Sequence, residues 1–176
     1  TEIVKNPNAI PDCDIILGGF PCQDFSVAGK RRGLEAKRGQ LYLSMVKIVN
    51  DKKPLAFIAE NVKGLLNIEK GEVIKIIEED FAKVGYDVSV NLFNAADYGV
   101  PQTRERVIIC GIRKDLKKKF IPPQPTHINK NKPQINIAYD KLDNWVSAKD
   151  ALKDLEDIEE GGMANHFWSK AKLTPG

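Results

Sequence analysis

The sequence lacks any apolar run long enough to cross a membrane, and it has no basic-then-apolar segment of the kind that forms a signal peptide. It has only three cysteines, and their odd number and wide spacing are typical of free thiols in a reducing compartment. Its net charge of +3 is small, so the charge permits an anionic partner without arguing for one. We therefore expect a cytoplasmic protein that makes no contact with a membrane.

The sequence does have the composition of a folded domain. Its 176 residues, of which 42% are hydrophobic and 29% charged, are enough for one domain with a core and part of a second. Apolar residues at helical spacing predict helices over 41–52 and 72–84, and Gly85 is placed as a left-handed cap. Short apolar or β-branched segments predict strands over residues 14–18, 55–59, 88–93 and 106–112.

The order strand, helix, strand, helix, strand predicts a doubly wound, mostly parallel α/β sheet. Ligands of such sheets bind outside the carboxyl ends of the strands. The segments "GGFPC" and "AEN" follow the first two predicted strands, so Cys22 and Glu60 are expected to face one cleft. Beyond Lys114 a Pro-, Lys- and Asn-rich segment reads as a linker, and a short helix is predicted over 148–155.

Cys22 differs from the other two cysteines in its surroundings. Cys13 and Cys110 read as small buried hydrophobes, and Cys110 lies within the apolar segment "VIICGI". Cys22 follows two glycines and a proline and precedes a polar, basic loop. Proline restricts the backbone there, and nearby amides and cations favour the thiolate form of a cysteine. These residues alone leave a structural and a nucleophilic thiol equally open.

Two further groups of polar residues are candidates for a site. Glu60 directly follows "LAFIA", where a carboxylate is either a structural ion-pair partner or a catalytic acid, because burying it unpaired is costly. In a strand, Gln102, Arg104 and Arg106 would share a face. That face is either a solvated edge or a surface that binds an anion or a base edge.

Three blocks, "GGFPCQDFSVAG", "ENVKGL" and "NAADYGVPQTRERVIICGIR", occur in this order over residues 8–113. Together they resemble the DNA cytosine-5 methyltransferases, especially those of bacterial restriction-modification systems. The resemblance implies a Rossmann-like fold that uses S-adenosylmethionine. The family's amino-terminal Phe-x-Gly-x-Gly loop is missing, so the resemblance also implies an internal fragment with the carboxy-terminal half of the catalytic domain.

The resemblance assigns a role in catalysis to four residues. Cys22 corresponds to the nucleophile that adds to C6 of cytosine and so activates C5. Glu60 corresponds to the glutamate that protonates or hydrogen-bonds N3 and holds the exocyclic amine. Arg106 corresponds to the arginine that contacts O2 of the base, and Arg104 to the one that orders the site.

The resemblance also implies a methyl donor and a nucleic-acid partner. S-Adenosylmethionine supplies the methyl group, near positions that match Pro21 and Leu41, and no metal is implied. The target cytosine has to be flipped out of duplex DNA. The basic loop of about residues 23–40 is then expected to close over the DNA. The expected DNA contacts are Gln23, Ser26, Arg38 and Gln102.

The chain is expected to divide at residue 125. Residues 1–125 correspond to part of the catalytic domain, and residues 126–176 to a linker and the beginning of the target-recognition region. We expect a bacterial, nucleoid-associated monomer with a cognate restriction endonuclease. Two alternatives remain: a tRNA cytosine-5 methyltransferase, which shares the first two blocks, and a non-catalytic nucleic-acid-binding fragment.

Overall fold

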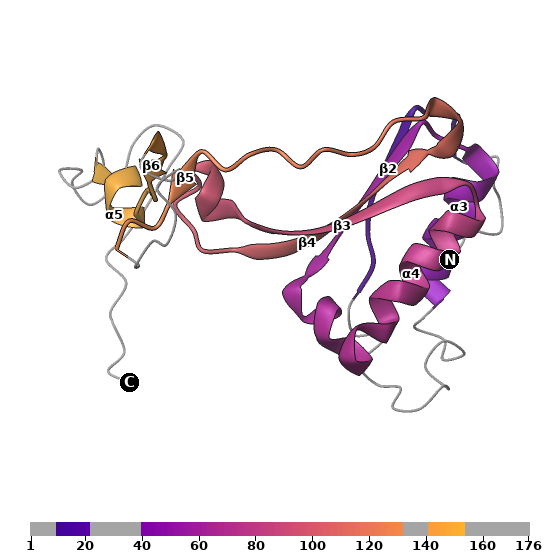
Figure 1. Ribbon diagram of the computed structural model, residues 1–176, viewed down its shortest axis with the longest axis horizontal. Coiled ribbons are helices and arrows are strands. Elements are labelled where there is room, and N and C mark those ends of the chain that lie inside the picture. The colour runs from indigo at the N-terminus through magenta and orange to yellow at the C-terminus, as the bar shows by residue number, and fades with distance from the viewer. Residues whose placement is uncertain (1–9, 22–39, 132–140, 154–176) are drawn as a thin grey trace, which may run out of the picture.

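The computed structural model describes residues 10–21, 40–131 and 141–153, which form a mixed α/β fold (Figure 1). In this part of the chain four strands form one sheet in the order β1-β2-β4-β3, and two strands form a small second sheet. The main sheet comprises β1 (Ile15–Gly19), β2 (Ala56–Val62), β3 (Tyr86–Asn94) and β4 (Glu105–Arg113). The second pairs β5 (His127–Ile128) with β6 (Asp143–Asn144).

Two longer helices and several short ones connect the strands. They are α3 (Gln40–Lys52), η2 (Lys63–Gly71), α4 (Glu72–Lys83), η3 (Ala95–Tyr98), η4 (Lys114–Leu116) and α5 (Ala148–Ala151). The predicted strands and the two predicted longer helices are confirmed, with bounds that differ by up to three residues. Gly85 has a φ of +102°, as the predicted left-handed cap requires. No helix in the described ranges is both long and apolar enough to span a membrane.

The prediction of a mostly parallel sheet is wrong for the described strands. β1 and β2 pair in parallel, but β4 pairs antiparallel with both β2 and β3. The cause is the connection between β3 and β4, which is a short loop with one turn of 3₁₀ helix. A parallel pair needs a crossover of a dozen or more residues, whereas a short loop returns the chain antiparallel.

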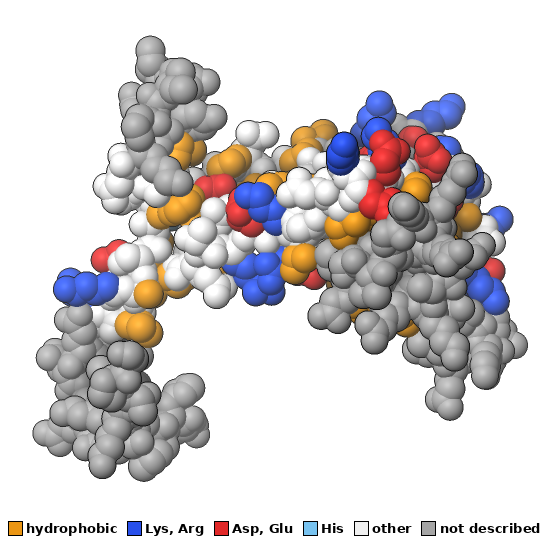
Figure 2. All heavy atoms as spheres, turned by 90° about the horizontal axis from the view of Figure 1, so that it is seen from below, with side chains coloured by type: hydrophobic (Ala, Val, Ile, Leu, Met, Phe, Trp, Pro, Cys, Tyr) orange, Lys and Arg blue, Asp and Glu red, His pale blue; other side chains and the backbone are white. Residues whose placement is uncertain are grey.

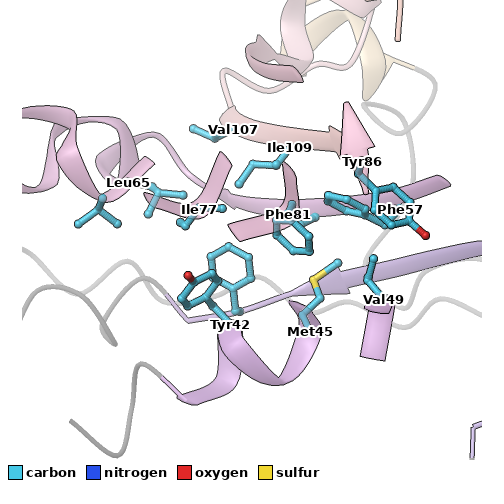
Figure 3. Close-up of a cluster of buried hydrophobic side chains, with 13 residues drawn as sticks. Tyr42, Met45, Val49, Phe57, Leu65, Ile77, Phe81, Tyr86, Val107 and Ile109 are labelled. Carbon is cyan, nitrogen blue, oxygen red and sulfur yellow. The ribbon is translucent and has the colours of Figure 1, made fainter. Parts of the chain in front are cut away.

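The core lies between one face of the main sheet and the helices α3 and α4 (Figure 3). Phe57 of β2 is fully buried and stacks on Phe81 of α4 with ring centroids 4.1 Å apart. The hydroxyl of Tyr42 on α3 donates a hydrogen bond to Asp80 on α4, which ties the two helices together. Burial of a phenylalanine side chain such as that of Phe57 contributes about 1.5–3 kcal/mol to the free energy of unfolding.

The opposite face of the sheet carries polar as well as apolar side chains. Because side chains alternate along a strand, the register places Glu60 and Arg106 on this face, away from Ala59 and Val107 in the core. Ile15 and Leu17 of β1 are 56% and 73% exposed. The site described below lies on this second face, at the carboxyl ends of β1 and β2.

The molecule has two parts (Figure 1). The main sheet with α3 and α4 forms the larger part, and β5, β6 and α5 form the smaller. β3 and β4 extend from the larger part toward the smaller, and η3 lies at their far end against β5. Figure 2 shows Lys and Arg side chains at the narrow middle of the molecule, between the two parts.

Candidate active site

Gly19 and Glu60 are direct neighbours across the β1–β2 pair. A Cβ atom added at Gly19 would lie 3.6 Å from the Glu60 carbonyl oxygen and 3.9 Å from its Oε2. Gly19 is exposed, and because it has no side chain it places no atoms beside this carboxylate. Glu60 was expected just after the strand but lies within β2, with 47% of its side chain exposed.

The chain that follows β1 is fixed to β2 by Asn61. The Asn61 side chain is 3% exposed, and its Nδ2 donates a hydrogen bond of 2.8 Å to the Phe20 carbonyl oxygen. Its Oδ1 accepts a hydrogen bond of 2.9 Å from the Val62 amide. Phe20 itself is buried against the Tyr42 ring, with centroids 5.9 Å apart. The last residues before position 22 are thus held next to Glu60.

Glu60 and Arg106 form an ion pair across the β2–β4 pair. Arg106 Nε lies 2.7 Å from Glu60 Oε1, although its N–H is not aligned for a hydrogen bond. Arg106 Nη1 donates a hydrogen bond of 2.8 Å to the Glu105 carbonyl oxygen. The salt bridge that the sequence offered as a structural alternative for Glu60 therefore joins it to another predicted site residue.

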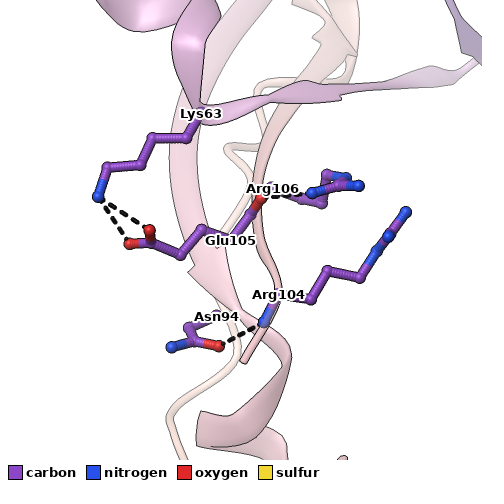
Figure 4. Close-up of polar contacts among 5 residues, drawn as sticks. All are labelled: Lys63, Asn94, Arg104, Glu105 and Arg106. Carbon is purple, nitrogen blue, oxygen red and sulfur yellow. Dashed lines mark hydrogen bonds and ion pairs between the residues drawn. The ribbon is translucent and has the colours of Figure 1, made fainter. Parts of the chain in front are cut away.

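Arg104 and Arg106 project to the same side of the chain, as predicted, and the Glu105 side chain projects to the other (Figure 4). Glu105 forms an ion pair of 2.9 Å with Lys63. The Arg104 amide donates a hydrogen bond of 3.1 Å to Asn94 Oδ1. The Arg104 side chain is exposed, so its guanidinium is available to a ligand.

Gln102 does not share the face of the two arginines. β4 begins at Glu105, and Gln102 lies in a tight turn where its amide donates to the Val100 carbonyl oxygen at 2.7 Å. Alternation along a strand therefore does not apply to it. Gln102 lines a separate cavity of about 330 Å³ that also contacts Asn129, Asn144 and Trp145.

A cavity of about 400 Å³ lies beside the two arginines. Its wall is mainly apolar and aromatic. The wall includes the rings of Phe93 and Tyr98, whose centroids are 5.9 Å apart. Flat apolar walls next to guanidinium groups suit a planar ring that is joined to an anion. The lining residues are Phe93, Ala95, Tyr98, Arg104, Arg106, Ile108, Phe120 and Pro123.

Four predicted site residues, Cys22, Gln23, Ser26 and Arg38, lie outside the described residues. The two residues expected near the methyl donor are both described. Pro21 is exposed at the end of β1, and Leu41 is 38% exposed in the first turn of α3. These two side chains offer apolar contact but no group that could bind a ribose or a sulfonium. By themselves they do not make a site for S-adenosylmethionine.

The prediction of a buried cysteine is confirmed for Cys110 but is wrong for Cys13. Cys110 is 2% exposed, and burial raises the pKa of its thiol. Cys13 is partly exposed. A raised pKa disfavours the thiolate, so Cys110 is poorly suited to act as a nucleophile.

Sequence reasoning gave no role to Asn61 and Asn94. The Asn61 side chain holds Phe20, two residues before Cys22, and the Asn94 side chain holds the backbone of Arg104 itself. A signal for Asn61 was present, since an asparagine in an apolar strand has to be hydrogen-bonded when it is buried. Asn94 directly precedes a short helix, which is a position that favours a capping asparagine.

Comparison with known proteins identifies the family to which this chain belongs. The sequence profile of the C-5 cytosine-specific DNA methylases matches residues 1–174. The chain belongs to this family. The matched range includes all three sequence blocks discussed above.

Among its relatives, the Type II methyltransferase M.NgoFVII of Neisseria gonorrhoeae is 57% identical over 126 residues. That match covers 72% of this chain and 34% of the relative. M.BsuRI of Bacillus subtilis, also a Type II methyltransferase, is 49% identical over 124 residues, which cover 70% of the chain and 28% of the relative. The chain thus spans about a third of the length of these relatives.

A solved structure supports the same assignment. A DNA modification methyltransferase encoded within an E. coli prophage is 28% identical, with a TM-score of 0.58. The match covers 92% of this chain and 40% of that one. The chain therefore has the mixed α/β, Rossmann-like fold of S-adenosylmethionine-dependent methyltransferases.

Proposed function

We propose that this chain forms part of an enzyme that transfers a methyl group to C5 of a cytosine flipped out of duplex DNA. The observation that carries the proposal is the ion pair between Glu60 and Arg106, in which Arg106 Nε lies 2.7 Å from Glu60 Oε1, beside the exposed Gly19. A carboxylate and a guanidinium in contact present an acceptor and donors side by side. This pattern complements the edge of cytosine that carries the exocyclic amine, N3 and O2.

Cys22 supplies the nucleophile in this proposal. Cys22 follows Phe20 by two residues in the sequence, and consecutive Cα atoms are about 3.8 Å apart. Phe20 is fixed to Asn61, the residue after Glu60. Covalent geometry thus limits how far the thiol can lie from the acid.

The reaction proceeds by addition and elimination. The Cys22 thiolate adds to C6, and negative charge develops on N3, where the Glu60 carboxyl group supplies a proton and Arg106 donates to O2. C5 then takes the methyl group, which S-adenosylmethionine supplies when bound. A base removes the C5 proton, and the electron pair of that bond re-forms the C5–C6 double bond and expels the thiolate. N3 returns its proton to the Glu60 carboxylate, which restores the ring and the acid.

The surrounding assignments follow from the same proposal. Residues 1–125 belong to the catalytic domain and residues 126–176 lead into the target-recognition region. The loop of about residues 23–40, with Gln23, Ser26 and Arg38, binds DNA phosphates and fills the space that the base leaves. In keeping with the name Type II methyltransferase that both relatives carry, we propose a sequence-specific enzyme that works beside a restriction endonuclease. We also propose that it is a monomer in the cytoplasm, associated with the nucleoid.

Trapping with 5-fluorocytosine tests the proposal. Fluorine at C5 cannot leave as a proton does, so the enzyme remains attached to C6. The natural full-length polypeptide containing this chain, given S-adenosylmethionine and fluorinated duplex DNA, is expected to form an adduct that mass spectrometry places on Cys22. Cys22→Ser should form none, whereas the matched control Cys110→Ser should form it normally. Methylation of tRNA in place of DNA, or DNA binding without an adduct, would overturn the proposal.

A further inference from the structure

The loop between β3 and β4, residues 95–104, joins the two parts of the molecule (Figure 1). Asp97, in the middle of η3, accepts a hydrogen bond from each of two separate segments. Its carbonyl oxygen accepts from the Thr126 amide at 2.9 Å, just before β5. Its Oδ1 accepts from Trp145 Nε1 at 2.9 Å, just after β6. One residue therefore holds both strands of the small sheet.

Neighbouring residues strengthen this junction. The Tyr98 hydroxyl donates a hydrogen bond of 3.0 Å to the Pro123 carbonyl oxygen. Gly99 has a φ of +83°, and a Cβ atom there would lie 2.8 Å from the His127 ring. The small sheet thus packs directly against the loop backbone. The hydrogen bonds Thr126–Asp97, Trp145–Asp97 and Tyr98–Pro123 thus all meet at two consecutive residues of η3.

The base of the same loop fixes Arg104. Asn94 Oδ1 accepts hydrogen bonds from the Ala96 amide at 3.2 Å and from the Arg104 amide at 3.1 Å. The Ala95 amide donates to the Arg104 carbonyl oxygen at 2.9 Å. These bonds leave few ways for η3 to shift without moving the Arg104 backbone. Arg104 in turn is two residues from Arg106, which contacts Glu60.

We propose that Asp97 and Trp145 are positioning residues that couple the part of the chain from residue 126 onward to the two arginines. The inference rests on the proposed function, in which that part leads into the target-recognition region. When a target DNA sequence binds to that part of the chain, the backbone of residues 94–104 would be fixed in position. The guanidinium groups of Arg104 and Arg106 would then be positioned with it. Neither Asp97 nor Trp145 has to touch the reacting base.

Four variants of the natural full-length polypeptide test the coupling: Asp97→Ala, Trp145→Phe, the two combined, and Asp97→Asn. Asp97→Ala removes the acceptor, Trp145→Phe removes the donor but keeps an aromatic ring, and Asp97→Asn keeps an acceptor oxygen. Amide hydrogen exchange of residues 94–104 reports the loop directly. Turnover on DNA separates kcat from KM.

We expect Asp97→Ala and Trp145→Phe each to speed exchange at Arg104 and to lower kcat about tenfold, the effect of losing one hydrogen bond to a charged group. KM for DNA should change less than about twofold, because binding contacts are kept. The double variant should be no worse than either single one, since both remove the same interaction. Asp97→Asn should restore most of the exchange protection and of kcat.

The matched control is Asp115→Ala, which removes an exposed aspartate paired with Arg113 at the other end of β4. It should leave exchange at Arg104 unchanged. Unchanged exchange at Arg104 in Asp97→Ala, or additive losses in the double variant, would overturn the coupling. Exchange needs no methyl transfer. An unaltered polypeptide that makes no 5-methylcytosine would therefore defeat the proposed function, while the exchange data would still decide the coupling.

Discussion

At the scale of single residues, Glu60 and Arg106 form a partly exposed ion pair. Pairs of this kind contribute only about 0–1 kcal/mol to the free energy of unfolding. A large effect of changing Glu60 therefore has to come from chemistry. The Lys63–Glu105 pair, equally close but on the other side of β4, offers a comparison.

Glu60→Gln is expected to slow methyl transfer about 10²- to 10⁴-fold, because the amide cannot supply a proton to N3. The free energy of unfolding should change by less than about 1 kcal/mol. Steady-state kinetics of the full-length polypeptide and urea denaturation measure the two effects. Glu105→Gln breaks the Lys63 pair and should leave the rate nearly unchanged. Equal losses of rate in both variants would contradict a chemical role for Glu60.

The raised pKa of Tyr42 makes the free energy of unfolding depend on pH in the alkaline range. Burial, followed by the hydrogen bond to Asp80, raises the pKa of Tyr42 far above its ordinary value. Above about pH 10 the unfolded chain loses this proton while the folded protein keeps it, so stability present below pH 10 declines as pH rises. Tyr42→Phe should be less stable at neutral pH by about 1–2 kcal/mol. It should also lose less stability between about pH 10 and 11.

Denaturation curves at a series of pH values check this prediction. Burial also raises the pKa values of Tyr86 and Cys110, so some alkaline loss will remain in the variant. A pH profile that Tyr42→Phe leaves parallel to that of the unaltered protein would contradict the assignment.

Which residues meet at the site was only partly predictable from the sequence. Glu60 and Arg106 stand out because charges beside apolar strands need partners, yet nothing in their spacing of 46 positions says that they pair with each other. That contact depends on β4 lying next to β2. Asn61 and Asn94 act through backbone groups of distant residues, and such partners exist only after the strands have paired.

At the scale of elements, the approach of β4 to Phe57 requires a residue without a side chain. A Cβ atom added at Gly111 would lie 2.0 Å from Phe57 Cε1. Phe57 cannot give way, because it is fully buried between Phe81 and Tyr86. Gly64 in η2 offers a comparison, because a Cβ atom added there would meet only a Val62 methyl group, at 3.9 Å.

Gly111→Ala is therefore expected to lower the free energy of unfolding by about 3 kcal/mol or more through overpacking. Gly64→Ala should change it by less than about 1 kcal/mol, since its backbone suits alanine. Urea denaturation of both variants provides the measurement. A stable Gly111→Ala protein would mean that β4 and Phe57 are not in contact as described.

The positions of the elements were predictable because apolar spacing marks each one, whereas the pairing of the strands was not. The segments that become β3 and β4 both read as strands, but their direction depends on the loop between them. η3 and the turn at Gly99 make that loop a hairpin. A sequence pattern that reports burial of one face says nothing about which neighbour a strand will choose.

At the scale of the whole molecule, the chain spans 34% of the Neisseria relative and 28% of the Bacillus relative. Its described residues near the expected methyl-donor site, Pro21 and Leu41, offer apolar contact only. We predict that this 176-residue chain alone binds S-adenosylmethionine at least about a hundredfold more weakly than the natural full-length polypeptide does, the effect of losing its polar contacts. Isothermal titration calorimetry of both checks this, and equal affinities would contradict it.

The two bonds of the Asn61 side chain have a mechanical consequence. Glu60 and Asn61 are consecutive, so the acid and the anchor for the segment leading to Cys22 sit on one rigid strand. A change that displaces this stretch of β2 would therefore displace the carboxylate and the attachment point of Phe20 together. In the proposed mechanism, one short stretch of backbone then governs both the acid and the segment that carries the nucleophile.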